Sequence, residues 1–283
     1  MGIIRLKHDI FCILSHIANL IICDKEEHVN HNTRKYFEKR VLRKAGTAVH
    51  DYRMIENGDR ILAAVSGGKD SIVLLKVLAE LKGAAPVSFE VVPVHVSTGF
   101  EKDFERITVW VKEELGFEVR IFDSGIKEIL EHVSDPEKSP CALCSRLRRG
   151  VLYSLAKREG FTSIALGHHL DDIIETFFLR CFYTGQIGAM APSRYSNDGR
   201  NRVIRPLAYC RNELVEGYFR TFGIEPVTSI CPIRPDGKRE RVRDYLKLLE
   251  KEIPTVKESV FSALGNIDVK SLCLKEAAGA HPH

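Results

Sequence analysis

One hexapeptide, SGGKDS at residues 66–71, constrains the fold of this chain more than any other part of its sequence. It stands between a short apolar run, RILAAV (60–65), and an apolar helical pattern over 71–81, so it joins a predicted buried strand to a helix. The paired glycines allow a tight turn and a close approach of the backbone to a ligand. Free N–H groups at the start of the helix, with the serine hydroxyls and the Lys69 ammonium, provide donors for an anion. The sequence therefore predicts a phosphate-binding loop at a strand end.

This loop is not a Walker A motif, which requires G-x-x-x-x-G-K-[ST]. It resembles the SGGxDS loop of ATP pyrophosphatases, which bind ATP and cleave it to AMP and pyrophosphate. An ordinary glycine-rich turn capped by Asp70 or Ser71 is the alternative, but the position at a strand-to-helix junction favours the nucleotide loop. The residues expected to contact ATP are Ser66, Gly67, Gly68, Lys69, Asp70 and Ser71, with Asp70 also expected to take part in catalysis.

Strand and helix patterns alternate along the middle of the chain. Strands are expected over 60–65, 89–96, 117–122 and 162–167, and helices over 33–52, 71–81, 104–115, 145–159 and 171–182. This alternation predicts an α/β fold with a parallel sheet and helices on both faces. From about residue 183 the punctuation indicates loop and hairpin, followed by helices over 212–222 and 238–250. The signals beyond residue 251 are weak, and we expect that end to fray.

A second strand end carries LGHHLDD, residues 166–172. Asp171 and Asp172 would open a helix there, and acids in that position commonly cap the helix and favour its dipole. The same carboxylates could instead hold Mg²⁺ against ATP phosphates, because Mg²⁺ favours one or two carboxylates together with phosphate oxygens. Two such strand ends in one sheet favour a shared crevice. We therefore expect Gly167, His168 and Asp172 to contact the nucleotide and Asp171 to serve in catalysis.

The composition is that of a globular protein. With 44% hydrophobic and 28% charged residues, the 283-residue chain can bury one large or two modest cores. A net charge of +4 permits a nucleic-acid partner without requiring one. The apolar segment 10–22 is shorter than the ~20 residues of a membrane span and lacks a small-residue cleavage site. We expect an amphipathic docking helix or extension there, no membrane role, and a cytoplasmic protein.

Eight cysteines in a chain this long do not form a disulfide framework, and only Cys141 and Cys144 are closely spaced. A CxxC pair can be a redox centre, half of a zinc site, or two ligands of an iron–sulfur cluster. A four-cysteine zinc site would need a second CxxC, which the sequence lacks, although histidines or isolated cysteines could complete one. A thioredoxin-like pair would follow a first strand directly, whereas this one follows the third strand and a long loop. Composition alone leaves the choice open.

From about residue 37 to 268 the chain is similar to the tRNA 2-thiocytidine synthetases. The resemblance is carried by the opening segment 37–71, PCALCSRLRRG (140–150), ALGHHLDDIIETFFLRCFYTG (165–185), RPLAYCRNEL (205–214) and VFSALGNI (260–267). That family holds a 4Fe–4S cluster on three cysteines, which implies Cys141, Cys144 and Cys231 as metal ligands here. The sequence departs from the pattern at the third ligand. Thr228 replaces the first cysteine of a second CxxC, and Pro-Ile-Arg follows Cys231 in place of Gly-Ser-Gln.

The resemblance implies a PP-loop, Rossmann-like fold and an enzyme that exchanges the C2 oxygen of an anticodon-loop cytidine in tRNA for sulfur. ATP would adenylate that oxygen, with Mg²⁺ near Asp171 or Asp172, and cluster-bound sulfide would attack C2 and release AMP. The implied partners are tRNA, a sulfur donor such as a cysteine desulfurase, and a second copy in a homodimer. The candidate phosphate contacts are Arg146, Arg148, Arg149, Arg234, Lys238, Arg239, Arg241 and Arg243.

Two alternatives stay open from the sequence. The chain could be another PP-loop enzyme acting on tRNA, such as a uridine thiolase or a lysidine synthetase, or it could be an RNA-binding module stabilised by zinc. The expected parts of the chain are an N-terminal extension (1–32), an N-terminal helix (33–58), the ATP-binding domain (59–185), a part that completes the cluster and RNA site (186–268), and a tail (269–283).

Overall fold

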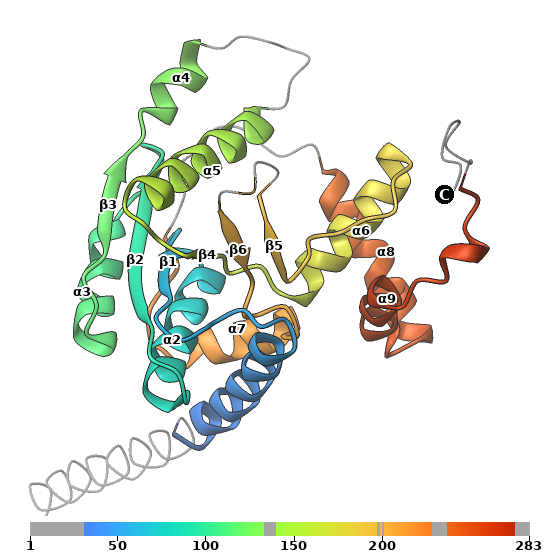
Figure 1. Cartoon of the computed structure of the whole chain (residues 1–283), viewed down its shortest axis with the longest axis horizontal. Coiled ribbons are helices and arrows are strands. Elements are labelled where there is room, and N and C mark those ends of the chain that lie inside the picture. The colour runs from blue at the N-terminus through green and yellow to red at the C-terminus, as the bar shows by residue number, and fades with distance from the viewer. Residues whose placement is uncertain (1–30, 133–139, 197–198, 200, 228–236, 275–283) are drawn as a thin grey trace, which may run out of the picture. The chain divides into compact units, whose positions relative to one another are not determined.

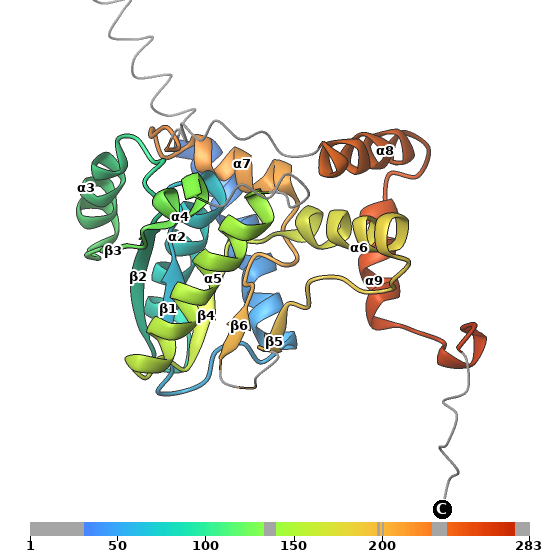
Figure 2. The ribbon, with the colours of Figure 1, turned by 90° about the horizontal axis from the view of Figure 1, so that it is seen from above.

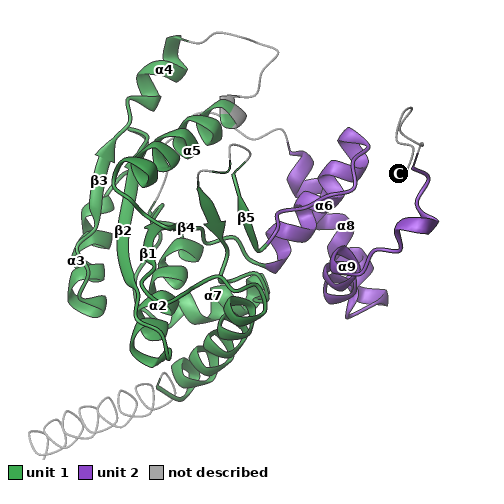
Figure 3. Cartoon of the chain, in the orientation of Figure 1, with its two compact units in different colours: residues 1–169, 192–235 green, residues 170–191, 236–283 purple. Residues whose placement is uncertain are grey.

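The computed structural model describes residues 31–132, 140–196, 199, 201–227 and 237–274. The chain forms two compact units, coloured separately in Figure 3. Unit 1 comprises residues 1–169 and 192–235, and unit 2 comprises residues 170–191 and 236–283. Within the described ranges, none of the helices has the length and apolar composition that a membrane crossing requires.

Unit 1 is the α/β part of the chain (Figures 1 and 2). After a helix that occupies residues 31–51, its elements are β1 (Arg60–Ala64), α2 (Lys69–Ala84), β2 (Glu90–Ser97), α3 (Phe104–Leu115), β3 (Arg120–Asp123), α4 (Ile126–His132), α5 (Pro140–Arg158), β4 (Ser163–Ala165), β5 (Ser193–Tyr195), β6 (Arg202–Ile204) and α7 (Asn212–Arg220). The sheet order is β3-β2-β1-β4-β6-β5. All neighbours pair in parallel except β5 with β6, as expected of a chain that returns after only residues 196–201, too short for a crossover helix.

The predicted sheet with helices on both faces is confirmed by the side chains of β1. Ile61 and Ala63 join one hydrophobic cluster with α2, α3, α7 and the 31–51 helix. Leu62 points to a second cluster, which contains Leu152 and Leu155 of α5. Because both faces of this strand are buried, its sequence is a continuous apolar run rather than an alternating one.

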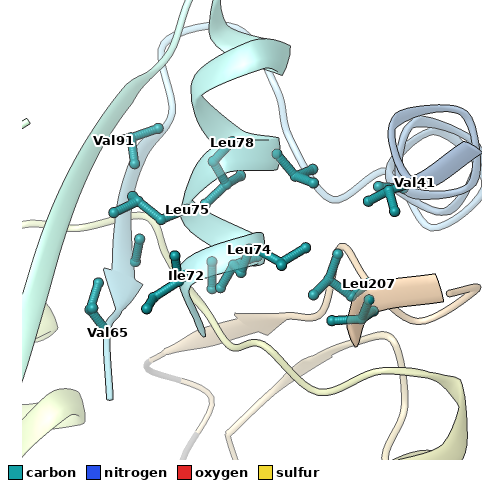
Figure 4. Close-up of a cluster of buried hydrophobic side chains, with 14 of the residues drawn as sticks. Val41, Val65, Ile72, Leu74, Leu75, Leu78, Val91 and Leu207 are labelled. Carbon is teal, nitrogen blue, oxygen red and sulfur yellow. The ribbon is translucent and has the colours of Figure 1, made fainter. Parts of the chain in front are cut away.

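Helix α2 is buried nearly all round. Figure 4 places it between Val65, just after β1, and Val91 of β2 on one side and Val41 of the 31–51 helix on the other, with Leu74 and Leu75 pointing into the cluster. A helix that is apolar on every side must be covered on every side. The 31–51 helix and α7 therefore form a layer outside α2, which explains the apolar sequence at the start of α2.

Unit 2 is helical, with α6 (Leu170–Thr184), α8 (Lys238–Glu252), α9 (Val256–Gly265) and a short 3₁₀ turn, η1 (Val269–Ser271). Leu170 and Ile174 of α6 pack against Val242 and Leu246 of α8, and the aromatic and aliphatic side chains of α9 complete this small core.

Three sequence-based expectations about secondary structure were wrong. The region after residue 251 does not fray throughout, because α9 packs against α6 and its helix is stabilised by that tertiary contact. Residues 126–132 form α4, where we expected a polar loop. Helix α5 begins at Pro140 rather than near Ser145, so the CxxC pair lies within the helix, and proline is favoured in the first turn of a helix.

Candidate functional site

The SGGKDS loop connects β1 to α2 and is closed by its own serines. The Ser71 hydroxyl donates to the Gly68 carbonyl (2.8 Å) and accepts from the Ser66 N–H (3.1 Å). The Ser66 hydroxyl lies 3.1 Å from that of Ser71 and accepts from the Gly68 N–H at 3.3 Å. These bonds hold the loop in a fixed shape at the start of α2, where backbone N–H groups favour an anion.

Gly67 is required by both its backbone angle and its surroundings. Its φ of +80° lies in the left-handed region that favours glycine. A Cβ at this position would lie 2.5 Å from Val227 Cγ2 and 2.8 Å from Val227 Cβ, well inside van der Waals contact. The Gly67 carbonyl also accepts the Val227 N–H at 2.9 Å. Val227 therefore packs against the loop and hydrogen-bonds to it.

The second motif reaches the loop through Gly167. A Cβ on Gly167 would lie 2.8 Å from the carbonyl carbon and oxygen of Asp70 and 3.0 Å from the Ser71 nitrogen, all of them backbone atoms. The chain after β4 and the first turn of α2 are thus packed against each other so closely that only glycine fits. This contact brings two of the sequence-predicted motifs together within unit 1.

His169 and Asn212 are two members of this site that the sequence reasoning did not assign. The His169 Nε2 lies 3.7 Å from the Asp70 carboxylate, and the histidine is almost fully buried. The Lys69 ammonium donates to Asp70 (2.6 Å) and to the Asn212 side chain at the start of α7 (2.7 Å). His169 belongs to the motif LGHHLDD and Asn212 to RPLAYCRNEL. Neither motif by itself predicts which segment of the chain its side chains will contact.

His95 supports the loop from the sheet side. Its ring is buried, Nδ1–H donates to the Val65 carbonyl at 2.8 Å, and the imidazole stacks on Phe104 with centroids 3.6 Å apart. Burial lowers the pKa of His95, and the hydrogen bond to Val65 and the charge of Glu101 oppose this only in part. Through this hydrogen bond, the neutral imidazole fixes the carbonyl of Val65, the residue before Ser66.

Glu101 closes the loop that follows β2. Its carboxylate accepts the N–H and the hydroxyl of Thr98 at 3.1 and 2.7 Å, and the Gly99 N–H at 3.1 Å. Burial alone would raise the pKa of Glu101, but the hydrogen bonds from Thr98 outweigh it and lower the pKa. This carboxylate therefore stays charged and fixes the backbone of Thr98 and Gly99, just after β2.

Cys141 and Cys144 lie in the first turn of α5, both half-buried. Residues three apart on a helix share a face, so two thiolates here suit a common metal or cluster. Cys231, the implied third ligand, lies outside the described residues, as does Arg234. Among the described residues, no group of three or more His, Cys, Asp or Glu side chains is arranged to hold a metal ion.

Two other cysteines differ in environment. Cys210 is completely buried, and burial raises its pKa to about 12, as expected of an unreactive core thiol. Cys181 is only half-buried, with its sulfur 3.7 Å from the Gln186 carbonyl.

In unit 2, the two acids of LGHHLDD are paired with cations. Asp171 is almost fully buried and its Oδ1 lies 2.7 Å from the Lys257 ammonium, which also contacts Glu250 at 2.8 Å. Asp172 lies 3.3 Å from Arg239. Mg²⁺ bound to either carboxylate would compete with these ion pairs.

Several candidate RNA contacts are likewise engaged within unit 2. Arg243 forms two hydrogen bonds with the buried Glu175 (2.8 and 3.2 Å), which raise the pKa of Arg243, and Arg239 lies 3.4 Å from the same carboxylate. Lys238 lies over the ring of Tyr183 at 5.4 Å. On α5 of unit 1, Arg146 and Arg149 are exposed and Arg148 is half-buried.

Known proteins resemble this chain in sequence and in fold. Residues 37–247 match the family model of the PP-loop domain. A protein of Shewanella denitrificans named tRNA-cytidine(32) 2-sulfurtransferase is 45% identical over 230 residues, 81% of this chain and 71% of that protein. A protein of the same name from Pseudomonas fluorescens is 41% identical over 232 residues, 81% of this chain and 84% of its own length.

Among solved structures, the fold resembles the U34-tRNA thiolase NcsA from Methanococcus maripaludis, which was determined with its 4Fe–4S cluster. The TM-score is 0.68, the sequence identity is 24%, and the match covers 87% of this chain and 86% of that one. This likeness supports the fold assignment.

Proposed function

The chain belongs to the tRNA-cytidine(32) 2-sulfurtransferase family of PP-loop proteins, and from this premise we propose that it replaces the C2 oxygen of cytidine 32 in tRNA with sulfur, using ATP. It is an enzyme, a tRNA sulfurtransferase with an ATP-binding PP-loop domain. The packing of Gly167 against Asp70 and Ser71 carries the proposal, because it joins the two motifs into a single site. That site then combines anion donors with a titratable cluster at the carboxyl ends of two strands.

The phosphates of ATP bind at the N-terminus of α2 in this proposal. Lys69 keeps its contact with Asp70, exchanges its contact with Asn212 for a phosphate oxygen, and neutralises charge there. The C2 oxygen of cytidine attacks the α-phosphorus of ATP. The bond between the α-phosphorus and the oxygen that bridges to the β-phosphorus breaks, and pyrophosphate is released. Asp70, with His169 beside it, orients the ammonium of Lys69. Asp171 and Asp172 are the proposed ligands of Mg²⁺, which would supply positive charge to the phosphates when bound.

Sulfur must bond to C2, the carbon that carries the adenylated oxygen, and the bond from C2 to that oxygen must break. Cys141 and Cys144 suit the proposed 4Fe–4S cluster because both thiols lie in one helical turn, and Cys231 is the proposed third ligand. When bound, such a cluster supplies a deprotonated sulfur nucleophile. Bond formation between sulfur and C2 releases AMP, which carries away the former C2 oxygen. A cysteine desulfurase as the sulfur donor and a homodimer are further parts of the proposal.

The test is thiolation with purified components under anaerobic conditions. Protein, ATP, a sulfide source and unmodified tRNA should yield AMP, pyrophosphate and 2-thiocytidine, detected by mass spectrometry of the tRNA nucleosides. Cys141→Ala and Cys144→Ala should each lose the iron chromophore and thiolation but keep ATP binding. Cys181→Ala is the matched control and should keep all three.

The outcomes distinguish the alternatives. Formation of 2-thiouridine in place of 2-thiocytidine would overturn the choice of base. Lysidine formation would place the chain among the ligases, and stoichiometric zinc without iron after anaerobic reconstitution would exclude the cluster. Iron content that survives Cys231→Ala would transfer the third-ligand role to another residue.

A further inference from the structure

The helix over residues 31–51 has a face that the proposed chemistry does not use. Its inner face packs into the main core of unit 1 through Val41, Ala45 and Ala48, all fully buried. Its outer face carries exposed cations: Lys35, Lys39, Arg40 and Arg43. We propose that this outer face binds the phosphate backbone of tRNA. The inference rests on tRNA being the substrate.

The cations are grouped by the geometry of the helix. At 3.6 residues per turn, Lys35, Lys39 and Arg43 form a ridge, and together with Tyr36 and Arg40 they fall within an arc of about 140°. The ridge is about 12 Å long. The three cations of the ridge can therefore each contact a different phosphate of one nucleic-acid strand. One helix face therefore presents a row of positive charge on the scale of a nucleic-acid strand.

The acids of this helix do not neutralise the row. Glu38 accepts a hydrogen bond from the Tyr218 hydroxyl of α7 at 3.1 Å, and Asp51 accepts one from Tyr209 at 2.9 Å. Both carboxylates are thereby directed to the rest of unit 1. Among the described residues, none of the four cations forms an ion pair, so their charge is available to a ligand.

Tyr36 adds a contact that a nucleic acid can use. Its ring is 54% exposed, its hydroxyl accepts a hydrogen bond from Arg40 at 2.9 Å, and the Arg40 guanidinium lies 5.1 Å from the ring centroid. An exposed ring held beside a guanidinium is a surface on which a base can stack. A row of simple solvated charges would not require this arrangement.

The chemistry of the face favours RNA over an anionic membrane. A helix that lies on a membrane inserts its apolar side chains into the lipid. Here that side is already covered, because Val41, Ala45 and Ala48 pack in the protein core. The exposed face offers charge and one aromatic ring, which are the features of a backbone-binding nucleic-acid surface.

The experiment compares two variants with the same change in net charge. Lys35→Gln, Lys39→Gln and Arg43→Gln are combined in the test variant, and Lys102→Gln, Lys112→Gln and Lys157→Gln, three exposed positions elsewhere in unit 1, are combined in the control. Affinity for full-length tRNA is measured by titration between about 50 and 200 mM salt. Thiolation kinetics give kcat and the KM values for tRNA and ATP.

The test variant should bind tRNA at least about tenfold more weakly, and the slope of log affinity against log salt should fall by about two, since three phosphate contacts are lost. The KM for tRNA should rise equally, while the KM for ATP stays at the parental value. The control should change tRNA affinity by less than about twofold, as expected for exposed charges that do not form a row on one helix face.

Failure of the inference and failure of the proposed function give different results. If the parent thiolates tRNA and the test variant keeps the parental affinity and salt slope, the surface is not an RNA contact. Loss in the control equal to that in the test variant would assign the effect to net charge and overturn the inference. Binding of parent, but not test variant, to phosphatidylserine vesicles with unchanged tRNA affinity would make the face a membrane contact. A parent that neither binds nor modifies tRNA would refute the proposed function first.

Discussion

Substitution of Gly67 by alanine tests whether the phosphate loop is held in place by its contact with Val227. Two costs follow from the structure. A side chain at φ +80° costs about 1–2 kcal/mol because its Cβ crowds the backbone in the left-handed region. The new Cβ would also lie 2.5 Å from Val227 Cγ2, and relief of such overpacking costs typically about 1–3 kcal/mol. We expect Gly67→Ala to lower the free energy of unfolding of unit 1 by roughly 2–5 kcal/mol.

The two costs can be separated with Val227→Ala. This second substitution removes Cγ2, the atom closest to the new methyl group, but leaves Val227 Cβ and the backbone angle of residue 67 unchanged. The double variant should therefore regain about 1–2 kcal/mol over the sum of the single effects, a coupling that a double-mutant cycle measures. Urea unfolding can be followed by Trp110, the single tryptophan, which stacks on Phe222 in unit 1.

Gly68→Ala is the matched control. Gly68 has φ −79°, and a Cβ there would meet only the Ser66 hydroxyl oxygen at an ordinary 3.5 Å. The weaker capping by alanine and the smaller unfolded-state entropy offset each other, so the change should stay within about 1 kcal/mol. The reasoning is refuted if Gly67→Ala costs no more than this control, or if its effect and that of Val227→Ala are strictly additive.

Three further perturbations have defined outcomes. Gly167→Ala should abolish ATP-dependent turnover and destabilise unit 1 without rescue by Val227→Ala, because the obstructing atoms belong to the backbone of Asp70; turnover at the parental rate would contradict the close packing. Lys257→Met should remove the cation that lies 2.7 Å from the buried Asp171 carboxylate and destabilise unit 2 by about 3–5 kcal/mol. The measurement is loss of helical circular dichroism in urea, and an unchanged midpoint would show that the pair contributes nothing. Burial lowers the pKa of His95 below 6.5, so the unfolded chain binds the proton more readily, and stability should fall by up to about 1.4 kcal/mol per pH unit as the pH drops below about 6.5. His95→Gln should make this acid-side decline of the urea midpoint shallower, and an identical slope would assign the decline to other groups.

Much of the fold could be predicted from local sequence patterns. The apolar run 60–65, the hexapeptide after it and the helical pattern over 71–81 correspond to β1, the loop and α2. Such patterns succeed because strand and helix periodicity report directly which faces of an element are buried. They fail where a helix depends on its neighbours, as α9 does, because the weak local preference of residues 256–265 is overridden by packing against α6.

The candidate site was predictable in its parts but not in its contacts. The nucleotide loop and the CxxC pair are recognisable because each is a contiguous motif. His169 and Asn212 cannot be assigned from their own motifs, because His169 contacts Asp70 and Asn212 contacts Lys69, both in a distant segment of the sequence. Side-chain partners across the sheet depend on strand order, which no local window contains.

The sequence by itself determined the chemistry that this protein can carry: a glycine-rich anion loop, a close thiol pair and a family-wide set of motifs in order. Tertiary structure alone decided which of these residues meet. The sheet order places β4 beside β1, and this brings Gly167 against the first turn of α2. Val227, which is far from Gly67 in the sequence, packs against it in the fold. Tertiary structure also pairs Asp171 with Lys257, a partner that the sequence around Asp171 does not predict. The physical reason is that backbone conformation is set by neighbours in sequence, whereas desolvation and charge pairing are set by neighbours in space.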